Sequence, residues 1–435
     1  MRTSVFMTVG KSAAALVCVA LMGAQSAPVG AHTAPVGAQS AVTGAETTEE
    51  VLVRRFNTQG QTSGPGGYRW YEPTEAIAGA HDGFFEVVPP EERTIPEDAL
   101  DEARAYARRN RSESLLVWHR GALQSADYWM GLGPSDVVNS RSMHKMAGGL
   151  LIARAIADGH IDSLDDSVAR YIPRWRGTDK EPMTIRNVLQ MSSGLRWFGI
   201  RDEPITGLSS RRYLSPYWDE VLLEEVPMSF TPGSEYDYSD ITADIMPHII
   251  EGATGMRYAE YFSEALLKPL GALGGFIWVN REGGMPHGGC CLMLPPETWL
   301  RFGLFVMNSG TWSGRQLLPD YWMTEMLTPS PNNEHFGLMI WLGKPHVERR
   351  LYHRADSWLN DVPKPGVYHS EPYLADDLIL FDGSEGRSVM IVPSEQLVIV
   401  RTGFRPLPDQ PEWDNAFLPN TVISGIKRAM SDTTP

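Results

Sequence analysis

Two residues with complementary chemistry, Ser142 and Lys145, stand three apart at the start of RSMHKMAGGLLIARAIADG, residues 141–159. On a helix this spacing puts both side chains on one face, with Cβ atoms about 5–6 Å apart. A serine hydroxyl becomes an effective nucleophile when a base takes its proton, and a lysine can do so when burial lowers its pKa. The chemistry that this pair could perform is therefore nucleophilic attack by Ser142 with Lys145 as its proton partner. The helix N-terminus would offer N–H groups to a developing oxyanion.

The S-x-x-K spacing alone is weak evidence, because Ser424 and Lys427 repeat it in a segment predicted to be a C-terminal helix. What distinguishes the first copy is the chain that follows it. An ordered series of short motifs comes after Lys145: Gly159-His160-Ile161, Leu164-Asp165-Asp166, Tyr171-Ile172-Pro173, Thr184-Ile185-Arg186 and Ser193-Gly194-Leu195. This series resembles the serine β-lactamase and penicillin-binding-protein superfamily, in particular its class C β-lactamase-related branch.

The resemblance implies an α+β, β-lactamase/transpeptidase-like fold, with a mixed antiparallel sheet flanked by helices and a mostly helical subdomain. It also implies that Tyr238, in Tyr238-Ser239-Asp240, lies beside the S-x-x-K pair and shares its protons. A phenol near a lysine cation would have a lowered pKa and could act as a base. Asp240 replaces the family's usual asparagine, and its carboxylate would stabilise Lys145 as a cation. This favours Tyr238 as the base, but the choice between Tyr238 and Lys145 stays open.

The third motif of the family is expected near the C-terminal hairpin, where Phe381-Asp382-Gly383-Ser384 is the best candidate. Gly383 would allow close approach of the substrate, and the Ser384 N–H would complete an oxyanion hole with that of Ser142. Phe381 cannot supply the cation that usually begins this motif. Arg387 is a candidate replacement, with a structural arginine as the alternative. The rival segment His287-Gly288-Gly289 is interpreted as structural.

Several segments have the patterns of regular elements that could hold these residues. Residues 96–110 have acidic residues in the first turn and arginines in the last, which predicts a helix. Residues 114–131 and 387–403 predict β-hairpins, with turns at Arg120-Gly121 and at residues 393–396. The patterns between the hairpins are mostly helical. A sheet built from segments far apart in the chain is therefore expected.

The composition excludes some classes of function. The chain has 435 residues, 42% of them apolar, a formal net charge of -15 and a pI near 5.2, so we expect no nucleic-acid partner. The sequence has no G-x-S-x-G elbow, H-E-x-x-H zinc helix, phosphate loop or G-x-G-x-x-G turn. We expect neither a metal nor an organic cofactor.

The N-terminus has basic residues followed by a short apolar run, which predicts a signal peptide over residues 1–31 with an undetermined cleavage site. We expect an exported protein, periplasmic or extracellular, with no lipid anchor at Cys18 and no stable membrane insertion after signal removal. Residues 32–88 are predicted to form a flexible leader and N-terminal arm. Residues 89–435 form the predicted hydrolase domain, mostly helical over about 155–340.

The remaining cysteines, Cys290 and Cys291, are neighbours in the sequence and therefore badly placed for ordinary disulfide geometry. We expect two buried thiols rather than a disulfide.

The resulting hypothesis is a serine hydrolase that cleaves an amide or ester bond of a small-molecule substrate through an acyl-enzyme on Ser142. The Tyr-Ser variant of the second motif and the missing cation of the third resemble the 6-aminohexanoate-dimer hydrolase and esterase branch. A D-amino-acid peptidase or β-lactamase is the alternative, and a non-catalytic binding protein on the same fold is a second one. The sequence leaves the substrate and the oligomeric state open.

Overall fold

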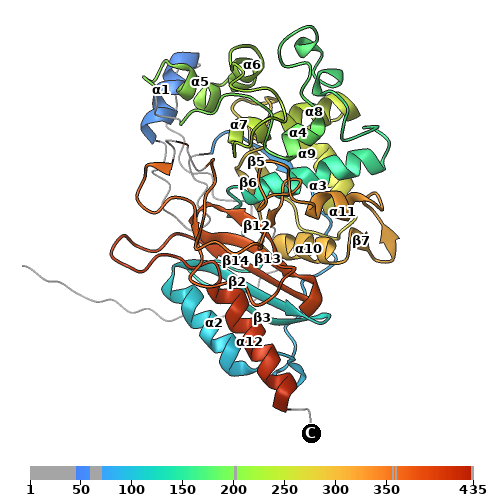
Figure 1. Cartoon of the computed structure of the whole chain (residues 1–435), viewed down its shortest axis with the longest axis vertical. Coiled ribbons are helices and arrows are strands. Elements are labelled where there is room, and N and C mark those ends of the chain that lie inside the picture. The colour runs from blue at the N-terminus through green and yellow to red at the C-terminus, as the bar shows by residue number, and fades with distance from the viewer. Residues whose placement is uncertain (1–45, 59–70, 200–202, 355–356, 358–359, 433–435) are drawn as a thin grey trace, which may run out of the picture. The chain divides into compact units, whose positions relative to one another are not determined.

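A six-stranded antiparallel sheet in the order β3-β2-β14-β13-β12-β9 carries the fold (Figure 1). The computed structural model describes residues 46–58, 71–199, 203–354, 357 and 360–432, so the predicted signal peptide lies outside the described residues. The sheet strands are β2 (Ser112–His119), β3 (Ala122–Tyr128), β9 (Trp341–Leu342), β12 (Ile379–Gly383), β13 (Arg387–Val392) and β14 (Leu397–Gly403). Both predicted hairpins are confirmed, and β2 pairs with β14 from the other end of the chain.

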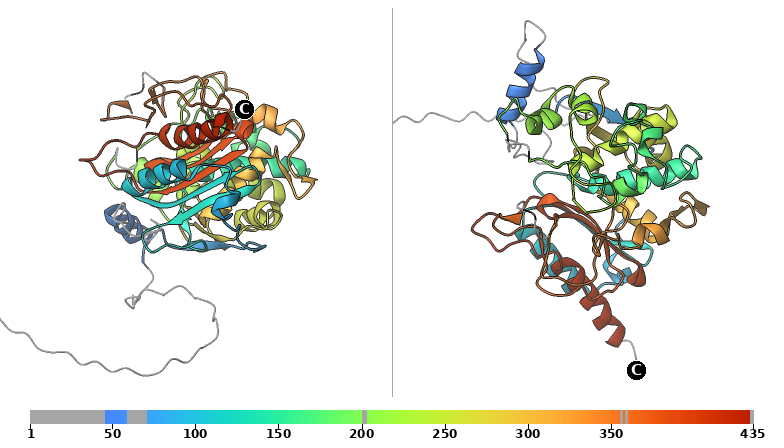
Figure 2. Two further views of the ribbon diagram at one scale, coloured as in Figure 1. Left: turned by 90° about the horizontal axis from the view of Figure 1, so that it is seen from below. Right: turned by 45° about the horizontal axis from the view of Figure 1, so that its top comes forward.

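Helices cover both faces of this sheet. On one face, α2 (Glu97–Arg109) packs against α12 (Phe417–Asp432) and β2, as Figure 2 shows from below. On the other face, α10 (Pro296–Met307) packs on β13 and β14, where Gly303 makes room for valine side chains of both strands. The predicted helix at residues 96–110 is confirmed as α2, with Glu97 and Asp98 in its first turn. The α+β architecture is confirmed as well.

The remaining helices gather above the sheet in Figure 1. They are α3 (Met143–Ala157), α4 (Ile185–Leu189), α5 (Leu208–Leu214), α6 (Trp218–Glu224), α7 (Asp240–Ala243), α8 (Ile245–Thr254), α9 (Tyr258–Phe262) and α11 (Trp322–Leu327). A small four-stranded sheet lies among them, formed by β1 (Thr74–Ile77), β5 (Gly275–Trp278), β6 (Leu292–Leu294) and β4 (Val138–Asn139). Sequence patterns did not predict this sheet, because strands of two to four residues are too short to show alternation.

The described part of the predicted N-terminal arm contains a helix and a strand. Helix α1 (Thr48–Thr58) packs on α5 and buries Leu52. The buried Arg55 guanidinium donates to the carbonyls of Leu214 (3.0 Å) and Asn280 (2.6 Å). Strand β1 pairs with β5, so the arm completes the small sheet. Among the described helices, none combines the length and apolar character needed to cross a bilayer.

Helix α3 lies at the centre of this architecture and is buried on nearly all sides. Its two central glycines allow neighbours to come close: a Cβ on Gly148 would lie 2.8 Å from Met246 Cε, and one on Gly149 would lie 2.8 Å from Met339 Cβ. The apolar run that follows Lys145 is therefore core. The helix that begins at the predicted nucleophile is thus fixed by packing.

Truncation of α3 in its middle tests this packing. Leu150 is 0% exposed, so Leu150→Ala leaves a cavity and should lower the free energy of unfolding by about 2–5 kcal/mol, measured by urea denaturation followed by circular dichroism. Leu374→Ala is the control, because Leu374 is 43% exposed and its loss should cost less than about 0.5 kcal/mol. Equal urea midpoints for the two variants would contradict a rigid α3 core.

Candidate active site

Ser142 occupies the N-cap of α3, but its side chain caps no backbone N–H. A serine at this position usually accepts such a bond. Here the hydroxyl instead accepts a hydrogen bond from Lys145 Nζ at 2.9 Å. The preceding residue, Arg141, has a left-handed backbone with φ +48°, which is uncommon outside glycine. The turn therefore presents a half-buried serine hydroxyl to the lysine amine, as the sequence spacing predicted.

Lys145 is buried, with only 2% of its surface exposed. Its amine makes a second hydrogen bond, to the carbonyl of Gly289 at 2.7 Å. Burial lowers the pKa of Lys145 to about 8, against the opposing effect of the Asp240 and Asp244 carboxylates. Near neutral pH a fraction of the lysine is therefore an uncharged amine able to accept a proton.

Asp240 lies beside this amine and is held by Arg212. Arg212 donates to both Asp240 oxygens, at 2.6 Å and 3.4 Å, and its guanidinium is buried. Burial raises the pKa of the Asp240 carboxyl, but Arg212 and then Lys145 lower it more, so Asp240 is ionised. The expectation that Asp240 stabilises the Lys145 cation has the correct sign. Burial of Lys145 nevertheless outweighs it, so the inference that Asp240 makes Tyr238 the preferred base is not supported.

Tyr238 stands next to the pair, as the family resemblance implied. Its ring lies 4.9 Å from Lys145 Nζ and packs against three aromatic rings, those of Phe336, Trp341 and Tyr352. Burial raises the pKa of the Tyr238 phenol, and the nearby Ser142 hydroxyl lowers it only partly. The predicted lowering of this pKa is therefore wrong: desolvation exceeds the effect of the lysine charge. Among the described residues, the buried Tyr238 hydroxyl has no hydrogen-bonding partner of standard geometry.

The candidate third motif lies at the end of β12, against the start of α3. A Cβ on Gly383 would lie 2.8 Å from the Ser140 carbonyl oxygen, so only glycine permits this approach. Ser384 is exposed, and both residues line a cavity of about 690 Å³ that also reaches Tyr352. The oxyanion hole formed by the Ser142 and Ser384 N–H groups stays a prediction.

The expected cation of the third motif is absent from this position. Phe381 is 0% exposed in the core. Arg387 is also fully buried, and it pairs with Glu385 at 2.9 Å and with Glu113 at 3.5 Å. The structure therefore supports the structural alternative for Arg387.

The second S-x-x-K pair lies elsewhere. Ser424 and Lys427 belong to α12, which packs on α2. Lys427 is exposed and donates to the Leu374 carbonyl at 3.2 Å. This copy has no buried amine and is structural.

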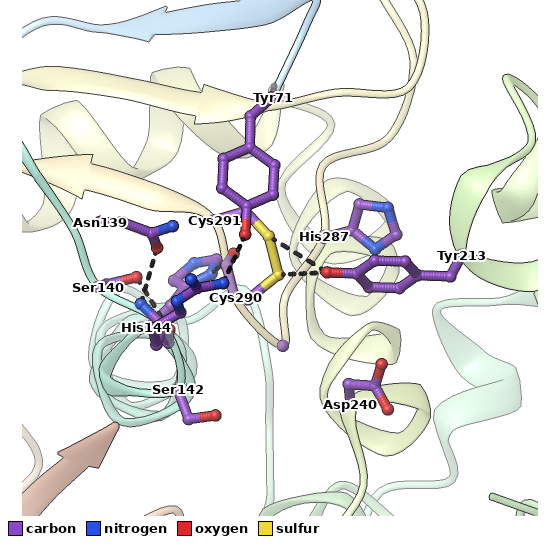
Figure 3. The surroundings of a disulfide bond; sticks show 12 residues. Tyr71, Asn139, Ser140, Ser142, His144, Tyr213, Asp240, His287, Cys290 and Cys291 are labelled. Atoms are coloured by element: carbon purple, nitrogen blue, oxygen red, sulfur yellow. Dashed lines mark hydrogen bonds between the residues drawn. A yellow bond between two sulfur atoms is a disulfide. The ribbon is translucent and has the colours of Figure 1, made fainter. Parts of the chain in front are cut away.

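Cys290 and Cys291 form a disulfide, so the prediction of two separate thiols is wrong (Figure 3). Cys291 has a left-handed backbone with φ +72°, and this conformation allows neighbouring residues to bring their sulfur atoms together. The Tyr213 hydroxyl lies 3.1 Å from Cys290 Sγ and 3.7 Å from Cys291 Sγ. In Figure 3 the disulfide lies between Tyr213 and the start of α3.

The segment that leads into this disulfide is structural, as predicted, but it also reaches the site. His287 packs between two tryptophan rings, stacked on Trp218 and Trp278. Its nitrogens bond Asn280 at 2.9 Å and Asp244 at 3.3 Å. The Gly289 carbonyl that holds Lys145 was not predicted, because a backbone acceptor leaves no signal in residue type. Among the described residues, no three His, Cys, Asp or Glu side chains converge in a way that would hold a metal ion.

Comparisons with known proteins agree with this geometry. Residues 98–289 match the family model described as Beta-lactamase. Protein flp of Staphylococcus aureus (strain NCTC 8325) is 25% identical over 150 residues, which is 34% of this chain and 29% of that protein. The matched stretch thus spans less than a third of this curated relative.

Two solved structures show the same fold across most of the chain. A Bacillus anthracis protein named "Putative 6-aminohexanoate-dimer hydrolase" has 17% identity and a TM-score of 0.59, covering 91% of this chain and 97% of its own. A class C β-lactamase has 16% identity and a TM-score of 0.53, covering 75% and 97%. The chain thus resembles the Beta-lactamase family over residues 98–289 and shares the fold of these two solved structures.

The effect of Asp240 on the Lys145 amine can be measured through the reactivity of Ser142. Because Asp240 raises the pKa of Lys145, Asp240→Asn should lower that pKa. The rate of reaction of Ser142 with a fluorophosphonate should then rise at a lower pH than in the wild type.

Asp219→Asn is the matched control, since Asp219 is also a buried aspartate paired with an arginine, Arg281 at 2.7 Å, and is not among the charges that shift the Lys145 pKa. An acidic limb that is unchanged in Asp240→Asn, or that moves equally in both variants, would contradict the assignment.

Proposed function

We propose that this protein hydrolyses an amide or ester bond of a small substrate through an acyl-enzyme on Ser142. The observation that carries the proposal is the 2.9 Å hydrogen bond between the Ser142 hydroxyl and the buried Lys145 amine. A lysine whose pKa is about 8 can accept the serine proton at a modest cost near neutral pH.

The proposed reaction begins with attack of Ser142 Oγ on the substrate carbonyl carbon, while the uncharged Lys145 amine takes the hydroxyl proton. The carbonyl oxygen becomes an oxyanion beside the N-terminus of α3, where N–H groups and the helix dipole stabilise negative charge. The Ser384 N–H is the proposed second donor. Proton return to the leaving group frees the amine or alcohol and leaves an ester on Ser142. Water then attacks this ester and releases the acid.

Tyr238 is the proposed proton carrier between Lys145 and the leaving group. Its ring is 4.9 Å from Lys145 Nζ, and its hydroxyl is buried without a hydrogen-bonding partner of standard geometry. Because burial raises the pKa of this phenol, it stays protonated and suits donation better than abstraction. The assignment of Lys145 as base and Tyr238 as donor follows from these opposite environments.

The substrate class is supported by the altered third motif. Phe381 carries no charge, and the Arg387 guanidinium is buried. Neither residue therefore presents a cation to a substrate. The cavity of about 690 Å³ beside Gly383 is large enough for a small molecule and has apolar sides at Leu407 and Trp413, while Ser142, Lys145 and Tyr238 are not among its lining residues. The likeness to the B. anthracis protein named for 6-aminohexanoate-dimer hydrolysis supports linear amides as candidates. Simple esters and linear amides are our first choice.

A D-amino-acid peptidase or β-lactamase is the second candidate. Arg405 and Lys364 line the same cavity from other segments of the chain, and Arg405 is exposed. Either cation could pair with the carboxylate that both kinds of substrate carry. The substrate panel below therefore includes a D-peptide and a β-lactam.

Export of the protein is also part of the proposal. It is supported by the predicted signal peptide and by the Cys290–Cys291 disulfide, because disulfides persist mainly in oxidising compartments.

Active-site labelling tests whether the protein is a serine hydrolase. A fluorophosphonate should attach to Ser142 in the wild type, and Ser142→Ala should lose both the adduct and at least roughly 10³-fold in kcat on a p-nitrophenyl ester. Peptide mass spectrometry locates the adduct. Ser424→Ala removes the other S-x-x-K serine and should label and turn over as the wild type does. A wild type without adduct at Ser142 would support the non-catalytic alternative and refute the proposal.

A panel of substrates tests the bond and the substrate class. Short p-nitrophenyl esters and linear 6-aminohexanoate amides should exceed a chromogenic cephalosporin and a D-Ala-D-Ala peptide by at least about tenfold in kcat/KM, equivalent to about 1.4 kcal/mol in transition-state binding. Ser142→Ala gives the background rate for each compound. A cephalosporin or D-peptide at the head of the ranking would reverse our order of candidates.

A further inference from the structure

The Cys290–Cys291 disulfide adjoins the carbonyls that hold the first turn of α3. The Gly289 carbonyl accepts from Lys145 Nζ at 2.7 Å, and the next carbonyl, that of Cys290, bonds His144 Nδ1 at 2.9 Å. Two successive acceptors thus bind two successive side chains of the helix. One of these side chains is the proposed base.

The segment before the disulfide has little room to move on its other side. The Gly289 N–H donates to Asp244 Oδ1 at 2.9 Å, and a Cβ on Gly289 would lie 2.7 Å from Asp240 Cβ. The chain at residue 289 is therefore held between α3 on one side and the start of α7 and α8 on the other. At residue 291 the backbone adopts a left-handed conformation that a side-chain-bearing residue disfavours.

The covalent bond between the sulfurs joins Cys290 to this left-handed residue, Cys291. Cys291 is 0% exposed, whereas Cys290 is half-buried. The Tyr213 hydroxyl contacts both sulfur atoms, so the ring is supported from one side. Figure 3 shows this support opposite the start of α3.

We propose that the Cys290–Cys291 disulfide is a positioning element for Lys145, and that its reduction to two thiols lowers the reactivity of Ser142. The inference rests on the proposed function, since it assigns a role in the activation of the same serine. It adds that the enzyme is active in the disulfide form and weakened in the dithiol form.

A small dithiol can reduce the Cys290–Cys291 disulfide. A dithiothreitol thiolate attacks Cys290 Sγ, the Sγ–Sγ bond breaks, and the Cys291 thiolate leaves and takes a proton. The second dithiothreitol thiol then displaces Cys290 as a thiol and closes the cyclic disulfide of the reagent. Two electrons and two protons pass to the protein, and the reagent loses the same number.

Loss of the bond releases the local backbone. Cys291 can then leave the left-handed region, the Gly289 and Cys290 carbonyls lose their fixed places, and water can reach the Lys145 amine. Renewed hydration favours the charged amine, so the pH at which Ser142 becomes reactive should rise. The charged and titratable groups that face Lys145 are Asp240, Asp244, Arg212, Tyr238 and His144, and His287 acts in turn on His144.

The test uses the protein without its predicted signal peptide in three stages. It is measured before reduction, in the presence of dithiothreitol, and after the reagent has been removed in air. Apart from Cys18 in the predicted signal peptide, Cys290 and Cys291 are the only cysteines, so intact mass and thiol alkylation report this bond alone. At each stage we would measure fluorophosphonate labelling of Ser142, ester kcat and KM, and the pH dependence of labelling. Reduction should lower kcat by roughly 10- to 100-fold, leave KM little changed and move the acidic limb to higher pH. Reoxidation should restore all three.

A double variant, Cys290→Ser with Cys291→Ser, should have the kcat and the acidic limb of the reduced wild type. Dithiothreitol should change neither of them. Ser424→Ala, which keeps both cysteines, should respond to the reagent as the wild type does. Circular dichroism checks that the double variant is folded, and the reversible reduction of the wild type tests the proposal independently of that variant.

Two failures can be told apart. If the oxidised protein labels at Ser142 and reduction changes neither kcat nor the pH limb, the positioning role is wrong and the proposed function stands. If the oxidised protein does not label at Ser142, the proposed function is wrong and the positioning role falls with it. Free thiols at both cysteines in protein purified from an oxidising compartment would also overturn the inference.

Discussion

The site depends on keeping one lysine amine away from water while it touches one serine hydroxyl. In water the Lys145 amine would be charged and could not accept the Ser142 proton; here it is 2% exposed and lies 2.9 Å from that hydroxyl. Burial destabilises the charged form of Lys145 more than the Asp240 and Asp244 carboxylates stabilise it. The pKa of Lys145 therefore falls to about 8. The surrounding architecture serves to maintain this balance. The buried α3 fixes the backbone beneath the amine, and the Tyr238 ring covers its side.

Three distant parts of the chain must meet for the proposed chemistry to occur. The helix from Met143 supplies the pair, the segment before α7 supplies Tyr238, and β12 brings Gly383 against the Ser140 carbonyl. The large sheet makes the last meeting possible, because β12 and β13 are locked beside β14, which in turn pairs with β2 near the start of the domain. The same arrangement buries Phe381 in β12 and Arg387 in β13, so neither position presents a cation at the surface.

The sequence predicted correctly those features that depend on neighbouring residues, namely hairpins, helices and the spacing of side chains on a helix. The hairpins follow from apolar strand patterns and turn residues, α2 follows from its charge order, and the meeting of Ser142 with Lys145 follows from helical spacing. Other features depend on tertiary contacts that residue types do not record. The Gly289 carbonyl is a backbone group, the Arg212 partner of Asp240 comes from α5, and the raised pKa of Tyr238 depends on how deeply it is buried. The disulfide was excluded because a general rule of spacing was applied to neighbours, where a left-handed Cys291 permits the exception.

The most direct test of whether Lys145 can activate Ser142 is a titration of the Lys145 amine itself. Protein carrying ¹⁵N-labelled lysine would be titrated by NMR, with Lys145→Met used to assign the Lys145 resonance among the few lysines of the chain. The account predicts a midpoint of about 8 for Lys145, well below the value of about 10.4 that lysine has in model peptides. A Lys145 midpoint equal to that of the exposed lysines would contradict the central claim, because the amine would then be solvated and charged at neutral pH and unable to activate Ser142.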